Sequence, residues 1–278
     1  MRYIVVICIW LATLSGAMAA DAKAEDIVAQ HLDSIGTAEA RAAIKSLAVQ
    51  GTLHFRIMIG GGGESSGTWQ RLSEQRKSKF VMKFGDNKWW GEQFISDGDK
   101  ASFAMANSAH QYSVLGAFFV GHDSIVREGL LGGELGTGWA LQSIDPHRVK
   151  LDYVGRKKVD GRELDALEYL SKTNGEMTVK LYFDPETHHH VMTVYTVERL
   201  ATIAHTDVAN AHQQGLHFIL EERFSDFQTD KGITLPRQYD LRYSQELQNG
   251  STTVYDWAMT AEKVLQNPII PPANFELK

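Results

Sequence analysis

The stretch TVKLYFDPETHHHVMTVYTV, residues 178–197, has two apolar runs of period two on either side of a tight turn. In the first run Val179, Leu181 and Phe183 alternate with Lys180 and Tyr182, and Asp184-Pro185-Glu186 follows as a turn. Successive side chains of a strand point to opposite faces, so the pattern predicts two antiparallel strands that each bury one face.

The same alternation recurs in four other parts of the chain. It spans residues 53–59, 80–84, 239–243 and 255–259, and turn pairs such as Asn174-Gly175 and Asn249-Gly250 separate such runs. Asn-Gly and Asp-Gly favour tight hairpins because both positions tolerate positive φ. The chain is therefore predicted to be α+β and mainly β, with roughly ten to eleven strands in one curved antiparallel sheet that forms an incomplete barrel.

Helical periodicity is confined to the region before the first strand. Ile27, His31 and Ile35 fall on one face of a helix, Gly36 is a good residue to end it, and Thr37 is a good N-cap for a second short helix. We expect these N-terminal helices to cover part of the sheet.

The first twenty residues, MRYIVVICIWLATLSGAMAA, read as a cleavable export signal. Arg2 is the positive start, an apolar run follows, and Ala17-Met18-Ala19 is the small-x-small pattern that a signal peptidase needs. Cys8, the only cysteine, lies inside the apolar run, so the exported chain is expected to have no disulfide and no thiolate chemistry. The predicted location is the periplasm.

The remaining residues, 21–278, are predicted to form a single domain. The composition, 43% hydrophobic and 22% charged, is that of a globular chain, and no Pro- or Gly-rich linker divides it. The net charge of −6, with no basic block, argues against nucleic acid as a partner.

Gly116–Gly138 interrupts the strand pattern with seven glycines among apolar residues. Asp123 is expected to cap a short helix at Ser124–Glu128. The insertion is either a mobile lid over the sheet or a packed loop that fills one end of the barrel, and the sequence favours neither.

Two motifs raise the question of catalysis or metal binding. Gly63-Glu64-Ser65-Ser66-Gly67 matches G-x-S-x-G, but it reads as a hairpin tip followed by a strand, whereas a nucleophile elbow leads into a helix. His188 and His190 would share a face if a strand began at His188, and with Glu186 they offer ligands for Zn²⁺; the alternative is a solvated strand start. We expect no enzyme activity, no metal and no cofactor.

Aromatic side chains on the apolar strand faces are more informative. A strongly curved sheet with few bulky helices either closes on a packed core or encloses an apolar cavity, and cavities of this kind bind lipids. The residues expected to line such a ligand site are Phe55, Ile57, Phe80, Met82, Phe118, Phe119, Leu130, Leu181, Phe183, Tyr239, Leu241 and Trp257.

Several stretches, taken in order, resemble the LolA/LolB-like superfamily of periplasmic outer-membrane lipoprotein-sorting proteins. The resemblance spans nearly the whole exported chain and depends on the order and spacing of the stretches. They are IVAQHLDSIGTAEARAAI (27–44), GTLHF (51–55), LYFDPETHHHV (181–191), FSDFQTDKGITLPRQYDL (224–241) and NPIIPPANFEL (267–277).

This resemblance implies an incomplete antiparallel barrel whose open side is covered by helices. In the carriers of this superfamily the apolar concavity takes acyl chains of lipoproteins, and relatives act as envelope sensors that bind other proteins. The chain departs from a minimal carrier by its length and its glycine-rich insertion, and the sequence assigns no residue to the arginine that gates the carriers. The first expectation is thus transport of a lipid or acylated lipoprotein, with an envelope membrane protein as a further partner; the alternative is a non-enzymatic sensor.

Overall fold

The computed structural model describes residues 22–85, 91–105, 112–199, 216–247 and 249–276. The expected export signal, as well as Trp89 and Trp90, lies outside these ranges. Twelve strands form one sheet in the described residues, one more than the upper expectation. They are β1 (Ser46–Ile59), β2 (Glu64–Glu74), β3 (Lys77–Phe84), β4 (Glu92–Ser96), β5 (Ala101–Met105), β6 (Val149–Val159), β7 (Arg162–Ser171), β8 (Met177–Phe183), β9 (His190–Arg199), β10 (Leu216–Asp230), β11 (Ile233–Glu246) and β12 (Thr252–Gln266).

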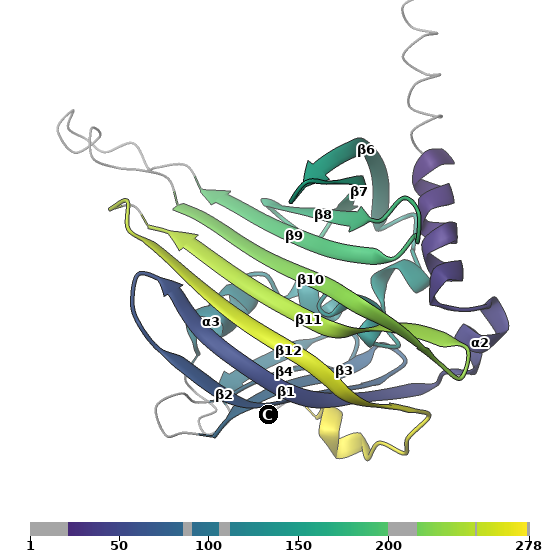
Figure 1. Ribbon diagram of the computed structural model, residues 1–278, viewed down its shortest axis with the longest axis horizontal. Helices are drawn as coiled ribbons and strands as arrows, with labels where there is room; N and C mark the ends of the chain where they lie inside the picture. The colour runs from purple at the N-terminus through teal and green to yellow at the C-terminus, as the bar shows by residue number, and fades with distance from the viewer. Residues whose placement is uncertain (1–21, 86–90, 106–111, 200–215, 248, 277–278) are drawn as a thin grey trace, which may run out of the picture.

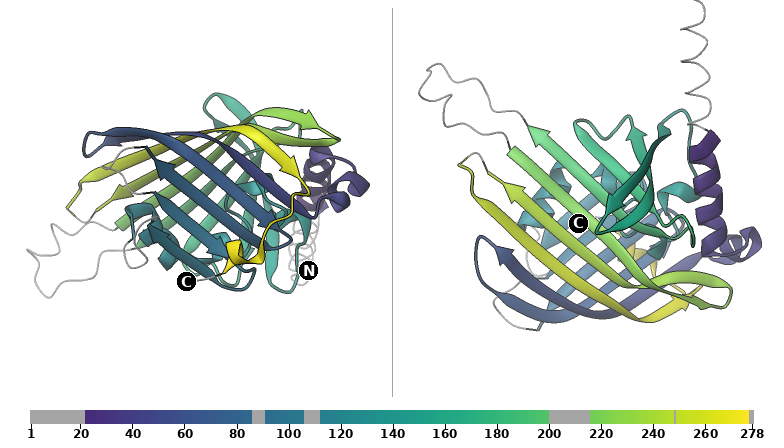
Figure 2. Two further views of the ribbon diagram at one scale, coloured as in Figure 1. Left: turned by 90° about the horizontal axis from the view of Figure 1, so that it is seen from below. Right: turned by 45° about the horizontal axis from the view of Figure 1, so that its top comes forward.

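The strand order is β5-β4-β3-β2-β1-β12-β11-β10-β9-β8-β7-β6, and the neighbours pair antiparallel. The first strand, β1, thus lies in the middle of the sheet, and the next four strands run outward to the edge at β5. The chain then resumes at the opposite edge with β6 and runs inward until β12 pairs with β1. Figures 1 and 2 show the sheet curled into a deep trough that is not closed, which confirms the predicted incomplete barrel.

Local irregularities in the long strands accompany this curvature. The register shifts between Gln50 and Gly51 where β1 pairs with β12, and between Tyr153 and Arg156 where β6 pairs with β7. Extra residues of this kind bend a strand and increase its twist.

Most helices occupy the concave face and one end of the sheet, whereas η3 (Pro272–Phe275) packs against the outer side of β3. The helices are the helix of residues 22–35, α2 (Ala38–Ala43), α3 (Val114–Gly121) and α4 (Ser124–Arg127), with short 3₁₀ helices η1 (Gly133–Leu135), η2 (Ala140–Gln142) and η3. Thr37 caps α2 as predicted, through Ala40 N at 3.2 Å. None of the described helices is long and apolar enough to cross a membrane.

The connection between the two sheet edges runs through the trough. We call residues 114–142, from α3 to η2, the plug. Its apolar side chains, including Leu115, Phe119, Ile125 and Leu130, are buried in the same core as the inner faces of the strands. Of the two expectations for Gly116–Gly138, the packed loop describes this arrangement.

Two local predictions in this region need correction. Asp123 makes no capping hydrogen bond, because its carboxylate pairs with Arg127 at 2.9 and 3.1 Å, and α4 ends at Arg127. The hairpin tip lies at Gly60–Gly63, since β2 already begins at Glu64. Ser65 is therefore a buried residue inside a strand, not the nucleophile of an elbow.

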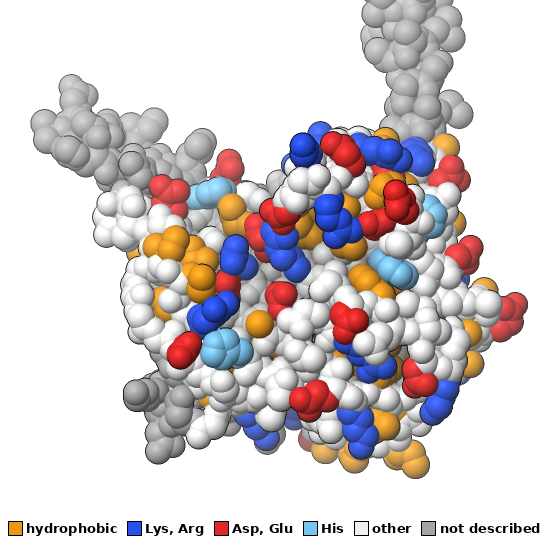
Figure 3. All heavy atoms as spheres, in the orientation of Figure 1, with side chains coloured by type: hydrophobic (Ala, Val, Ile, Leu, Met, Phe, Trp, Pro, Cys, Tyr) orange, Lys and Arg blue, Asp and Glu red, His pale blue; other side chains and the backbone are white. Residues whose placement is uncertain are grey.

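The outer face of the sheet is polar. Arg242 pairs with both oxygens of Asp256 at 2.7 and 2.8 Å, and Arg223 at the next strand pairs with Asp160 and Glu221. Figure 3 shows acidic and basic side chains interspersed over this face. The strands alternate in polarity because one face of the sheet packs on the core and the other contacts water.

Gly51 allows the backbones of β1 and β12 to approach closely where the two strands pair. A Cβ at this position would overlap the carbonyl oxygen of Thr260, whereas a Cβ at Gly62, in the β1–β2 turn, would meet no atom within 4 Å. Gly51→Ala should lower the free energy of unfolding by about 2 kcal/mol, because strand backbones must separate to admit the methyl group. Urea unfolding measures this, with Gly62→Ala as the control; equal stability of the two variants would contradict the close approach.

Candidate functional site

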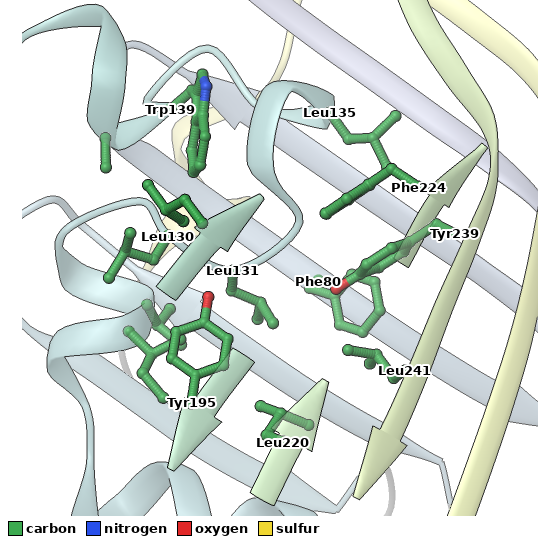
Figure 4. Close-up of a cluster of buried hydrophobic side chains, with 14 of the residues drawn as sticks. Phe80, Leu130, Leu131, Leu135, Trp139, Tyr195, Leu220, Phe224, Tyr239 and Leu241 are labelled. Carbon is green, nitrogen blue, oxygen red and sulfur yellow. The ribbon is translucent and has the colours of Figure 1, made fainter. Parts of the chain in front are cut away.

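The residues expected to line a ligand site come together in the trough. Eleven of the twelve are buried in one continuous cluster, and Ile57 packs against it half-buried. Phe55 lies 5.2 Å from Trp257 and Phe80 lies 6.2 Å from Tyr239, measured between ring centroids. Figure 4 shows Phe80, Tyr239 and Leu241 of the sheet facing Leu130, Leu131 and Leu135 of the plug.

The twelve residues belong to two structural groups. Phe118, Phe119 and Leu130 lie on the plug, and the other nine lie on strands of the sheet. The plug side chains occupy the trough and contact the sheet; for example, Phe118 lies 5.2 Å from Tyr243. In this conformation the plug fills the trough.

The sequence analysis placed His31 on the apolar face of a helix and named His190 as a possible metal ligand, but it did not predict that six buried polar residues meet at the same interface. They are His31, Arg71, Glu134, His190, Thr193 and Glu222. The strand period also carried a signal for two others: Arg71 follows Trp69 by two residues and Glu222 follows Leu220 by two, so both fall on the inner face.

Glu222 of β10 joins three elements of the core. Its Oε1 accepts from the Tyr195 hydroxyl, and its Oε2 accepts from the Tyr239 hydroxyl and from the backbone N–H of Gly132 on the plug, each at 2.6 Å. Burial raises the pKa of Glu222, although the hydrogen bonds oppose this, and it raises the pKa of both tyrosines. The carboxylate thus fastens the plug to the floor of the trough.

Arg71 of β2 lies against the glycines of the plug. A Cβ at Gly132 or at Gly136 would overlap its guanidinium, and Gly132 also has a positive φ of 72°. Burial lowers the pKa of Arg71, and the fields of Tyr239 and Glu222 oppose this. Within the described residues its Nε has no acceptor and no carboxylate forms a direct ion pair with it.

His190 connects the plug to β9. Its Nδ1 lies 3.2 Å from Glu134 Oε2 and its Nε2 lies 2.8 Å from the Thr193 hydroxyl. Burial is the largest single effect on Glu134 and acts against its ionisation, but the hydrogen bond from His190 and the electrostatic interactions with His190 and His31 together outweigh burial and lower the pKa of that carboxyl. Hydroxyl, imidazole and carboxylate follow the order of a catalytic triad, yet all three are buried and Trp139 stacks on the imidazole, so no substrate reaches the hydroxyl in this conformation.

His31 of the first helix reaches the opposite end of the plug. Its Nε2 accepts from the indole N–H of Trp139 at 3.0 Å, and its Nδ1 lies 3.2 Å from the carbonyl oxygen of His188. Burial lowers its pKa to about 4, so the imidazole is neutral at neutral pH. The N-terminal helix is thereby tied both to the plug and to the turn before β9.

The plug is also anchored where it begins. Ser113 caps α3 by accepting from Gly116 N at 2.8 Å and donates to Glu92 at 2.6 Å. Burial raises the pKa of Glu92 to about 7, with the Ser113 hydrogen bond opposing.

The expected strand start at His188 is wrong. His188 has a positive φ of 59° and β9 begins at His190, so the two imidazoles do not share a strand face. His190 is buried rather than solvated, because it points inward between Phe183 and Phe224. In the described ranges no group of three acidic, His or Cys side chains is arranged to hold a metal ion.

No protein-family model matches the sequence, and a comparison with curated proteins finds no match. The chain is similar to solved structures, each covering 91% of this chain and 97% of its own. They are a LolA superfamily protein from Nitrosomonas europaea (14% identity, TM-score 0.47), a putative outer membrane lipoprotein-sorting protein domain from Vibrio parahaemolyticus (9%, 0.49) and a DUF1329 family protein from Desulfovibrio piger (11%, 0.47).

His31 should make stability depend on pH below neutrality. Because its pKa falls from 6.5 to about 4 on folding, the unfolded chain binds this proton first, and the stabilisation present above pH 6.5 is lost as the pH falls towards 4. His31→Gln retains an acceptor for Trp139 but no titrating group, so its loss of stability between pH 6.5 and 4 should be smaller by up to about 3 kcal/mol.

Urea unfolding at several pH values measures this difference. His54→Gln is the control, because His54 lies on the outer face beside Ser66 and Glu64. Parallel pH profiles for wild type and His31→Gln would contradict a neutral, buried His31.

Proposed function

We propose that this protein is an exported, non-enzymatic carrier that binds an acyl chain or another apolar ligand in the trough by exchanging it for the plug. The observation that carries the proposal is the occupancy of the trough by a connecting segment. The plug is joined to the sheet mainly by apolar side-chain packing, and its polar attachments are a few discrete hydrogen bonds such as Gly132 to Glu222 and Thr137 to Ser73.

An acyl chain can replace the apolar contacts between the plug and the sheet. An acyl chain gains about 0.8 kcal/mol for each buried CH₂ group, so a chain of about ten methylenes offsets much of the burial that the sheet loses when the plug leaves. Gly129, Gly132 and Gly133 have positive φ values and supply backbone freedom inside the plug.

The N-terminal twenty residues support export, and the superfamily resemblance supports the narrower form of the proposal. In that form the protein works in the periplasm, its ligand is the acylated end of an outer-membrane lipoprotein, and an envelope membrane protein is its partner.

A protein-binding sensor on the same fold is the second candidate. One observation favours it: Met58, Ile59 and Leu247 expose large apolar side chains, and the strand register puts them at one end of the sheet. A docking surface for a protein partner needs such a patch.

Protein purified from a native-like periplasm should carry a stoichiometric lipid or acylated peptide. Mass spectrometry of an organic extract checks this and identifies the ligand class. Leu181→Glu, which puts a charge in the buried floor, should remove the ligand, whereas Leu170→Glu on the exposed side of β7 should retain it. A clean wild-type extract would count against the carrier and favour the sensor.

Locking the plug to the sheet should block ligand exchange. Thr137 N donates to Ser73 Oγ at 3.0 Å, so cysteines at both positions bring the plug and β2 within reach of a disulfide. The oxidised Ser73→Cys/Thr137→Cys protein should bind a fluorescent acyl probe at least about tenfold more slowly than the reduced form, with Thr137→Cys alone as the control. Equal rates in both redox states would show that exchange does not need the plug to move.

A further inference from the structure

The guanidinium of Arg71 is a buried cation whose hydrogen-bonding capacity is only partly used. Its Nε is buried without an acceptor, and its direct neighbours on the plug are the backbones of Gly132 and Gly136. A buried charge is costly unless it is hydrogen-bonded or paired. The arrangement therefore has capacity for one more oxygen ligand.

Glu222 is the carboxyl group whose field acts on Arg71, and its hydrogen bonds are made to other residues. Both carboxylate oxygens of Glu222 already accept hydrogen bonds, and the two tyrosines that donate them, Tyr195 and Tyr239, stand on strands β9 and β11. These donors stay with the sheet when the plug leaves, whereas the bond from Gly132 is lost. Arg71 and Glu222 are on β2 and β10, so their backbone separation is set by the sheet and not by the plug.

Displacement of the plug would leave Arg71 in more apolar surroundings. The two glycine backbones are removed, and the guanidinium is left in a trough lined by apolar side chains such as Trp69 and Phe80. An entirely apolar ligand would bury this charge without an acceptor. A ligand with an oxyanion would satisfy the fork of the guanidinium with two parallel hydrogen bonds.

We propose that the ligand that replaces the plug is an acyl chain with an anionic oxygen head group, a carboxylate or a phosphate, and that Arg71 binds this head. The inference depends on the general form of the proposed carrier function and adds the chemical class of the ligand to it. A free fatty acid or a phospholipid then takes the place of the acylated lipoprotein named in the narrower form. The acyl chain takes the place of Leu130, Leu131 and Leu135, and the head group takes the place of the plug backbone at Gly132 and Gly136.

Four probes with the same twelve-carbon length test the assignment: laurate, dodecyl phosphate, methyl laurate and dodecyltrimethylammonium. Their dissociation constants are measured by calorimetry on the delipidated exported chain. Laurate or dodecyl phosphate should bind about tenfold or more tightly than methyl laurate, and the cation should bind most weakly. Preference for laurate assigns a free fatty acid, and preference for dodecyl phosphate assigns a phospholipid head.

Variants separate the head-group contact from the chain contact. Arg71→Met should bind laurate and methyl laurate within about twofold of each other, and Arg71→Lys should keep part of the preference because it keeps the charge. Arg76→Met, which removes an exposed arginine at the β2–β3 turn, should retain the full preference. If Arg71→Met does not fold, Arg71→Lys still reports the loss of the two-pronged geometry.

The outcomes distinguish this inference from the function on which it depends. Equal binding of laurate and methyl laurate by the wild type, or an unchanged preference in a folded Arg71 variant, overturns the head-group assignment and leaves the carrier intact. Binding of none of the four probes overturns the carrier function itself.

Discussion

The structure depends on one topological constraint: the sheet is open, and the chain must cross its concave face to pass from one edge to the other. β5 and β6 are neighbours in sequence but occupy opposite ends of the strand order. The connection between them has to bury its apolar side chains somewhere, and the trough is the apolar surface that lies along its path. Twelve strands with one apolar face each thus acquire a core without closing into a barrel.

The polar groups at this interface give the plug a defined position. Apolar packing alone tolerates small shifts, whereas the bonds from Gly132 to Glu222, from Trp139 to His31 and between Glu134 and His190 are satisfied in one arrangement. Buried polar groups of this kind are costly when they lose a partner. A ligand that displaced the plug, as proposed, would therefore have to supply hydrogen-bond partners as well as fill the volume, and Arg71 has a buried Nε without an acceptor among the described residues.

Most of the architecture could be predicted from the sequence because strand periodicity is a local property. The runs around Phe55, Phe80, Leu181, Tyr239 and Trp257 appear as strands with those side chains inward. Thr37 was recognisable as a cap for the same reason. Asp123 was not, because its carboxylate had a competing partner in Arg127 one turn away.

The sequence by itself determined which residues form strands, which face of each strand is apolar, and that the sheet is curved and antiparallel, since period and turn chemistry act over a few residues. Only the tertiary structure decided that the glycine-rich insertion fills the trough and that β9 begins at His190. It also decided that Arg71, Glu222, His190 and His31 converge on that insertion. These outcomes depend on which distant segments share the inside of the sheet, and such contacts arise from strand order and volume, which leave no local pattern.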